Sequence, residues 1–183
     1  MNLPNTISLT RFLLLPLLLW LAWHGYKRAF LLLLALSFFS DVLDGWIARR
    51  FDMQTELGAR LDSWSDFFNY STMVLGGCWL WPDIMYQERI RVAIVVASFV
   101  LPVIVGLIRF RCLTSYHTWS VKLAVLLVGG SGLLMFANGT TWPFYIAVPF
   151  SVLAAADEIL ITLLAGKPHS NTPSFWHALR QSD

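Results

Sequence analysis

Four aspartates in an otherwise apolar chain are the residues best suited to chemistry. Asp41 and Asp44 are three positions apart, and Asp62 and Asp66 are four apart. Residues with these spacings lie on one face of an α-helix, so each pair projects from one side of its helix. A helical hairpin would point the two pairs at each other.

The acid pairs need compensation for their charge. An ionised aspartate inside a bilayer costs about 2.5 to 3.5 kcal/mol on insertion scales. Hard carboxylate oxygens suit Mg²⁺ or Mn²⁺, and the sequence has no Cys/His cluster of the kind that binds zinc. Four carboxylates can share two divalent cations, an arrangement suited to in-line displacement at phosphorus.

Small residues and one arginine accompany the acids. Gly45 and Gly58 leave space for a ligand near the backbone, and Ala48 keeps the next turn narrow. The guanidinium of Arg49 can hold phosphate or a base edge. The alternatives are close helix packing for the glycines and a cytoplasmic anchor for Arg49. The adjacent aspartates favour a ligand slot, because packing has no use for buried negative charge.

The composition indicates a membrane protein. The chain is 57% hydrophobic and only 13% charged, whereas about a quarter of the residues in soluble domains are charged. The net charge is +2 and the basic residues are dispersed, which excludes nucleic acid as a partner. No linker or repeat divides the sequence, so we predict a single membrane domain over residues 1–183.

Long apolar stretches, separated by breaker clusters at Gly25-Tyr26, Pro82-Asp83 and Asn138-Gly139, predict the membrane helices. Six of them approach the roughly 20 residues that a membrane helix needs. They cover residues 8–24, 30–49, 58–80, 88–108, 119–137 and 142–166, and a polar cytoplasmic tail covers 167–183. We expect an all-α integral membrane protein with a six-transmembrane-helix bundle, whose first helix is retained rather than cleaved as a signal peptide.

Charge and aromatic residues predict the orientation. Nine Lys and Arg residues fall on the side of the termini and four on the other, which favours cytoplasmic termini. Trp23, Trp79, Trp81 and Trp142 fall near the opposite ends of their spans, where an interfacial belt is expected. Cys78 is predicted near the outer face and Cys112 near the inner face, too far apart for a disulfide.

Residues 41–66 resemble the signature of the CDP-alcohol phosphotransferase family, Asp-x2-Asp-Gly-x2-Ala-Arg-x8-Gly-x3-Asp-x3-Asp, with every fixed position present. The resemblance implies that Asp41, Asp44 and Asp62 bind two divalent cations, Mg²⁺ or Mn²⁺. It implies that Asp66 shares this metal site and acts as the general base. The family is an enzyme family of phospholipid biosynthesis.

The same resemblance assigns the substrates. Gly45, Ala48, Arg49 and Gly58 fall where the family binds the CDP moiety of CDP-diacylglycerol. An alcohol hydroxyl would attack the phosphorus that bears the lipid, and CMP would leave. The resemblance also implies a homodimer in the cell (inner) membrane, with the active site facing the cytoplasm.

The acceptor alcohol is less strongly indicated. The run Pro4-x3-Ser8-x2-Arg11-x4-Pro16 resembles the opening of phosphatidylglycerophosphate and cardiolipin synthases in this family, which favours glycerol 3-phosphate. Those synthases usually have Asp-Pro-x-x-Asp-Lys where this chain reads Asp62-Ser63-Trp64-Ser65-Asp66-Phe67. Phosphatidylglycerol, inositol phosphate, inositol and serine therefore remain alternative acceptors.

Basic residues at the cytoplasmic ends of the fourth and fifth spans are candidates for binding an acceptor phosphate. Arg109, Arg111 and Lys122 are these residues, and the positive-inside bias explains them equally well. His117 is interpreted as a headgroup contact.

A cation transporter is the remote alternative from another class, because intramembrane carboxylates also mark ion pathways. Transporters tend to have repeated halves with broken helices, whereas the second half of this chain offers only Asp157 and Glu158 within its spans. We expect these two acids to pair with Arg109 or Lys122. A packing subunit without catalysis would have no need for carboxylates on two helices.

Overall fold

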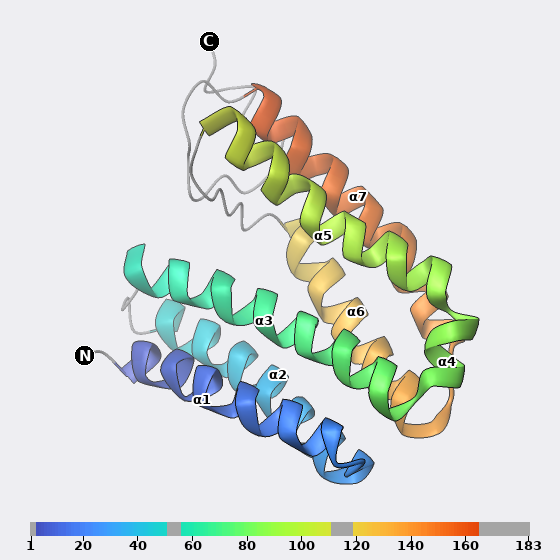
Figure 1. Ribbon diagram of the computed structural model, residues 1–183. Coiled ribbons are helices and arrows are strands. Elements are labelled where there is room, and N and C mark those ends of the chain that lie inside the picture. The colour runs from blue at the N-terminus through green and yellow to red at the C-terminus, as the bar shows by residue number, and fades with distance from the viewer. Residues whose placement is uncertain (1–2, 51–55, 111–118, 165–183) are drawn as a thin grey trace. The chain divides into compact units, whose positions relative to one another are not determined.

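The computed structural model describes residues 3–50, 56–110 and 119–164, and this part of the chain is helical throughout (Figure 1). The all-α prediction is therefore confirmed for the described residues. The helices are α1 (Leu3–Trp23), α2 (Lys27–Arg50), α3 (Glu56–Leu80), α4 (Pro82–Gln87), α5 (Arg89–Phe110), α6 (Trp119–Asn138) and α7 (Trp142–Leu164).

Each of the six predicted stretches corresponds to one long helix, and α4 is an addition. The break predicted at Pro82 and Asp83 separates α3 from α5, and it contains the short helix α4, which was not predicted. Proline fits the first position of a helix, because its fixed φ suits the helix and it lacks the N–H that would be unpaired there. Asp83 lies in the first turn, where a negative charge is favourable.

Within the described part of the chain, three helices are long and apolar enough to cross a membrane by length and composition. They span Arg89–Phe110, Trp119–Asn138 and Trp142–Leu163. A shorter apolar stretch, Leu13–Trp23, lies in α1. Helices α2 and α3 contain the charged motif residues and fall outside this group. The six-span count and the orientation of the termini stay predictions.

The helices pack as two compact units, Met1–Tyr86 and Gln87–Asp183. In the first unit α1 packs against both α2 and α3, and α2 also touches α3. In the second unit α7 packs against both α5 and α6. The single domain predicted for residues 1–183 is not decided by this division.

A glycine-terminated turn reverses the chain between α1 and α2. The N–H of Gly25 donates to Ala22 O (3.2 Å) and that of Tyr26 donates to Leu21 O (3.0 Å), the two bonds of a Schellman motif. Gly25 has a φ of 77°, and Gly139 after α6 has a φ of 74°. Side chains disfavour this left-handed conformation, so glycine is the residue suited to both turns.

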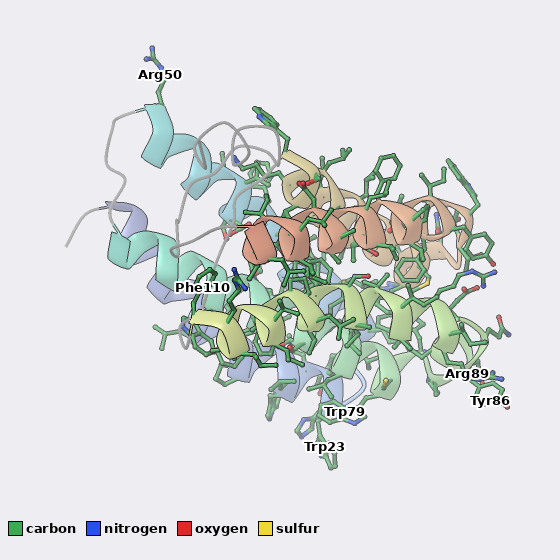
Figure 2. All side chains as sticks on the ribbon, turned by 90° about the horizontal axis from the view of Figure 1, so that it is seen from above. Trp23, Arg50, Trp79, Tyr86, Arg89 and Phe110 are labelled. Atoms are coloured by element: carbon green, nitrogen blue, oxygen red, sulfur yellow. The ribbon has the colours of Figure 1, made fainter. Side chains whose placement is uncertain are left out.

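Aromatic side chains mark one end of the first unit. The rings of Trp23 on α1 and Trp79 on α3 meet edge to face, with their centroids 5.4 Å apart. Both are exposed, and Figure 2 shows them together at the opposite end of the unit from Arg50, the last residue of α2. This arrangement agrees with an aromatic belt on one side and basic residues on the other.

A buried glutamate ties α5 to α7 in the second unit. Glu88 is only 4% exposed. Its carboxylate accepts hydrogen bonds from Arg91 (2.8 Å) and from the Tyr145 hydroxyl (3.0 Å). The Arg91 guanidinium also lies 4.0 Å from the centre of the Tyr145 ring. A buried charge needs such partners.

We expect Glu88→Ala to lower the free energy of unfolding by about 2 kcal/mol, because two donors lose a charged acceptor. Thermal unfolding of the purified protein in detergent measures the effect as a lower Tm. Asp83→Ala removes an exposed acid from α4 and should cost less than half as much. Equal losses for the two variants would contradict the role given to Glu88.

Candidate active site on two helices

The motif residues lie on two neighbouring helices of the first unit. Helix α2 carries Asp41, Asp44, Gly45, Ala48 and Arg49, and α3 carries Gly58, Asp62 and Asp66. Of these side chains the structure describes those of Asp41 and Asp66, and both are half-buried. The side chains of the other six lie outside the described residues.

A buried hydrogen bond joins α2 to α3 next to the motif. The Ser37 hydroxyl donates to Asn69 Oδ1 at 2.9 Å. Ser37 is 0% exposed and Asn69 is 1% exposed, so neither is accessible to solvent. Ser37 precedes Asp41 by one helical turn, and Asn69 follows Asp66 by about one turn. The bond therefore fixes the two helices directly beside the acids.

A second contact between α2 and α3, farther from the acids, is made by an aromatic ring. A Cβ atom on Gly76 of α3 would come within 2.3 Å of the Phe30 ring, which projects from α2. The ring thus occupies space that only glycine leaves free. Directly beside the Ser37–Asn69 hydrogen bond, Phe38 of α2 lies against Tyr70 of α3, with ring centroids 5.2 Å apart.

These contacts define an antiparallel register. Seven residues forward along α2, from Phe30 to Ser37, correspond to seven residues back along α3, from Gly76 to Asn69. Figure 1 shows the two helices running in opposite directions. Continued toward the motif, this register sets position 41 level with 65 and 66, 44 level with 62, and 48 level with 58.

The motif positions also share a face with the hydrogen-bonded residues. Positions 37, 41, 44 and 48 of α2 recur every three or four residues, as do 69, 66, 62 and 58 of α3. Ser37 and Asn69 point at each other. The positions of both acid pairs therefore lie on the helical faces that carry Ser37 and Asn69.

Two polar residues of the site were not identified from the sequence. The Ser65 hydroxyl and the Asn69 amide nitrogen are buried and have no hydrogen-bond partner. Each residue follows one aspartate of α3, Asp62 or Asp66, by three positions, so it lies on the same helical face. A polar residue at this spacing in an apolar helix was the signal that could have found them.

The donor set decides how well a divalent cation fits this site. Among the described side chains there is no group of three or more Asp, Glu, His or Cys residues close enough to bind a metal. Asp44 and Asp62 do not belong to that set. Carboxylates on two level, facing helices supply the hard oxygen ligands that Mg²⁺ or Mn²⁺ prefers, so the residue types fit the ions.

The candidate phosphate-binding residues belong to the second unit. Arg109 and Lys122 are both exposed, at the end of α5 and the start of α6. The Arg109 guanidinium lies 5.7 Å from the centre of the Phe110 ring. The Lys122 ammonium lies 5.3 Å from that of Trp119. Arg111 and His117 lie outside the described residues, as does Cys112.

One of the two acids of α7 has a neutral partner on α6. Asp157 accepts a hydrogen bond of 2.5 Å from the Ser120 hydroxyl on α6, in place of the ion pair that we expected. A hydroxyl satisfies the carboxylate without the cost of desolvating a second charge. Glu158 lines a small pocket together with Ser98 and Ser151.

Comparison with known proteins identifies the family. A sequence profile of the CDP-alcohol phosphatidyltransferases matches residues 1–165. The chain belongs to the CDP-alcohol phosphatidyltransferase family. No solved structure matches it significantly.

Curated relatives in this family have several acceptors in their names. A CDP-diacylglycerol–glycerol-3-phosphate 3-phosphatidyltransferase of Aquifex aeolicus is 36% identical over 66 residues, which is 36% of this chain and 37% of the relative. A CMP-forming cardiolipin synthase of Streptomyces coelicolor is 32% identical over 120 residues, 60% of this chain and 52% of the relative. A CDP-diacylglycerol–inositol 3-phosphatidyltransferase of Schizosaccharomyces pombe is 29% identical over 125 residues, 66% of this chain and 52% of the relative. The chain thus spans about half or less of the length of these relatives.

We expect Gly76→Ala to destabilise the protein by about 1 to 3 kcal/mol, because Phe30 is 0% exposed and its ring has little room to move. Gly130→Ala on α6 is the matched control, since nothing lies within 4 Å of its added Cβ. Thermal unfolding in detergent should show a lower Tm for the first variant only. Adding Phe30→Leu to Gly76→Ala should recover part of the loss, and no difference between the two alanine variants would refute the packing.

Proposed function

We propose that this protein transfers a phosphatidyl group from CDP-diacylglycerol to a hydroxyl acceptor and releases CMP. The α2–α3 register is the observation that carries the proposal, because it gives the two acid pairs a common level and a common face. Family membership supports the reaction type. The opening of the sequence and the glycerol-3-phosphate enzymes among the relatives favour glycerol 3-phosphate as the acceptor.

Asp41, Asp44, Asp62 and Asp66 are proposed to hold two divalent cations, Mg²⁺ or Mn²⁺. Bound there, the ions would neutralise the pyrophosphate of the CDP-lipid and the charge on departing CMP. Two bound cations would also offset the cost of placing four carboxylates in an apolar bundle.

Asp66 is the proposed general base. Its carboxylate takes the proton from the acceptor hydroxyl, and the oxygen then forms a bond to the phosphorus that bears the lipid. The bond between this phosphorus and CMP breaks in the same displacement, so no covalent enzyme intermediate is needed. Holding both reactants in line supplies much of the rate.

The CDP moiety is proposed to bind beside the acids. Gly45, Ala48 and Gly58 would leave a narrow slot between the helices, and the register that sets positions 48 and 58 level supports this. Arg49 would hold a phosphate or the base edge with its forked guanidinium.

A phosphorylated acceptor is proposed to approach Arg109, Arg111 and Lys122. The exposure of Arg109 and Lys122 leaves them accessible to an anion. A cardiolipin synthase and an inositol 3-phosphatidyltransferase among the relatives support keeping other acceptors open. These alternatives are phosphatidylglycerol, inositol phosphate, inositol and serine.

We propose six membrane-spanning helices in one domain, residues 1–183, with both termini and the active site on the cytoplasmic side of the cell (inner) membrane. Helix α2 has 24 residues and α3 has 25, which at about 1.5 Å per residue suffices to cross roughly 30 Å of hydrocarbon. The separation of Trp23 and Trp79 from Arg50 supports the orientation. Residues 167–183 would form a cytoplasmic tail, and a homodimer is the proposed assembly.

This topology predicts opposite labelling of the two cysteines in sealed right-side-out vesicles. In the Cys112→Ser variant, exposed Cys78 should react with a membrane-impermeant maleimide added from outside. In Cys78→Ser, Cys112 should react only after the membrane is permeabilised. The reverse pattern would invert the proposed orientation.

The reaction is tested by CMP release from CDP-diacylglycerol by the purified protein with Mg²⁺ or Mn²⁺. The acceptors are glycerol 3-phosphate, phosphatidylglycerol, inositol phosphate, inositol and serine. We expect metal-dependent release with one of them, and a loss of about 10²-fold or more in kcat for Asp66→Asn, because the base is removed.

Asp83→Asn is the matched control, because Asp83 is an exposed acid outside the motif, and it should keep wild-type activity. Activity that survives in Asp66→Asn would remove Asp66 from the chemistry. No release with any acceptor would reject the proposed reaction, and uptake of divalent cations by proteoliposomes would then favour the transporter alternative.

A further inference from the structure

Two buried donors next to Asp66 have no partner within the protein. Ser65 and Asn69 are each 1% exposed. The Ser65 hydroxyl and the Asn69 Nδ2 make no hydrogen bond. Leaving a buried donor unpaired costs about 1 to 3 kcal/mol. Two such groups one helical turn apart therefore indicate a place where a ligand oxygen belongs.

Ser65 differs from other hydroxyl residues in the helices of this chain. Ser71 donates to Phe67 O at 2.7 Å, four residues back along α3. Ser98 and Thr162 likewise donate to the carbonyl four residues earlier, each at 2.8 Å. An isolated helical serine satisfies its hydroxyl in this way. Ser65 does not, although it lies beside an aspartate.

Asn69 is held so that its nitrogen stays available. Its Oδ1 accepts the hydrogen bond from the buried Ser37 hydroxyl of α2. The amide is thereby oriented by a neighbouring helix, with Nδ2 as the remaining donor. Ser65 and Asn69 are four residues apart on one helical face, and Asn69 also follows Asp66 by about one turn.

We propose that Ser65 Oγ and Asn69 Nδ2 bind a second oxygen of the acceptor, adjacent to the hydroxyl that Asp66 deprotonates. The acceptor would then be a vicinal diol, a class that includes glycerol phosphates, inositols and the glycerol headgroup of a lipid. This inference rests on the proposed function, because it places the acceptor at Asp66. It adds that the site recognises two adjacent hydroxyl groups of the acceptor.

The test compares glycerol 3-phosphate with 3-hydroxypropyl phosphate, which lacks the middle hydroxyl, as acceptors for CDP-diacylglycerol. Wild-type protein should prefer the diol by about 10-fold in kcat/KM. Ser65→Ala and Asn69→Ala should raise the KM for glycerol 3-phosphate about 5- to 10-fold and abolish the preference. Ser65→Ala should leave the KM for CDP-diacylglycerol unchanged, because it keeps the Ser37–Asn69 hydrogen bond that joins α2 to α3. Ser65→Thr, which keeps the hydroxyl, should restore the preference.

Ser71→Ala is the matched control, since it removes a hydroxyl already bonded to its own helix, and it should behave as wild type. An unchanged preference for the diol in Ser65→Ala and Asn69→Ala would overturn the inference while leaving the reaction intact. The same holds for wild-type activity with serine alone, which has no vicinal diol. Absence of CMP release from wild-type protein with every acceptor would instead reject the proposed function.

Discussion

The contact between α2 and α3 is the constraint on which the candidate site depends. A buried hydrogen bond from Ser37 to Asn69 and a phenylalanine ring seated against Gly76 fix both the distance and the register of the two helices. Hydrogen bonds between membrane helices contribute about 0.6 to 2 kcal/mol. The larger effect of this hydrogen bond is geometric. If α3 were displaced by one residue relative to α2, a different face of the helix would meet α2, and one acid pair would turn away from the other.

The negative charge of acidic side chains in the helices is compensated differently at three places in the chain. Glu88 is neutralised by Arg91 and by the Tyr145 hydroxyl. Asp157 accepts a single hydroxyl from a neighbouring helix. The motif acids occupy positions on facing surfaces of two helices, where a shared cation is the compensation that we propose. Glu88 and Asp157 have hydrogen-bond donors within the protein, and the ligand role of the motif acids is part of the proposal.

The neutral polar side chains also differ in whether they have a hydrogen-bond partner. Some hydroxyls elsewhere in the helices, such as those of Ser71 and Ser98, donate to the carbonyl four residues earlier in their own helix. Ser65 and Asn69 retain free donors beside Asp66. Buried polar groups without partners are rare in folded proteins. Their position at the edge of the acid face extends the candidate site by one turn of α3.

The sequence by itself determined the long helices and the candidate residues of the site. Helix positions followed from the lengths of the apolar runs and from glycine turns, and the acid spacing predicted each aspartate pair on one face. The sequence analysis missed α4, the partner of Asp157 and the two buried donors of Ser65 and Asn69. Only the tertiary structure decided these, together with the register that levels the two acid pairs. The physical reason is that such contacts join residues far apart in the chain, 32 positions for Ser37 and Asn69, and no local pattern records which helix faces which.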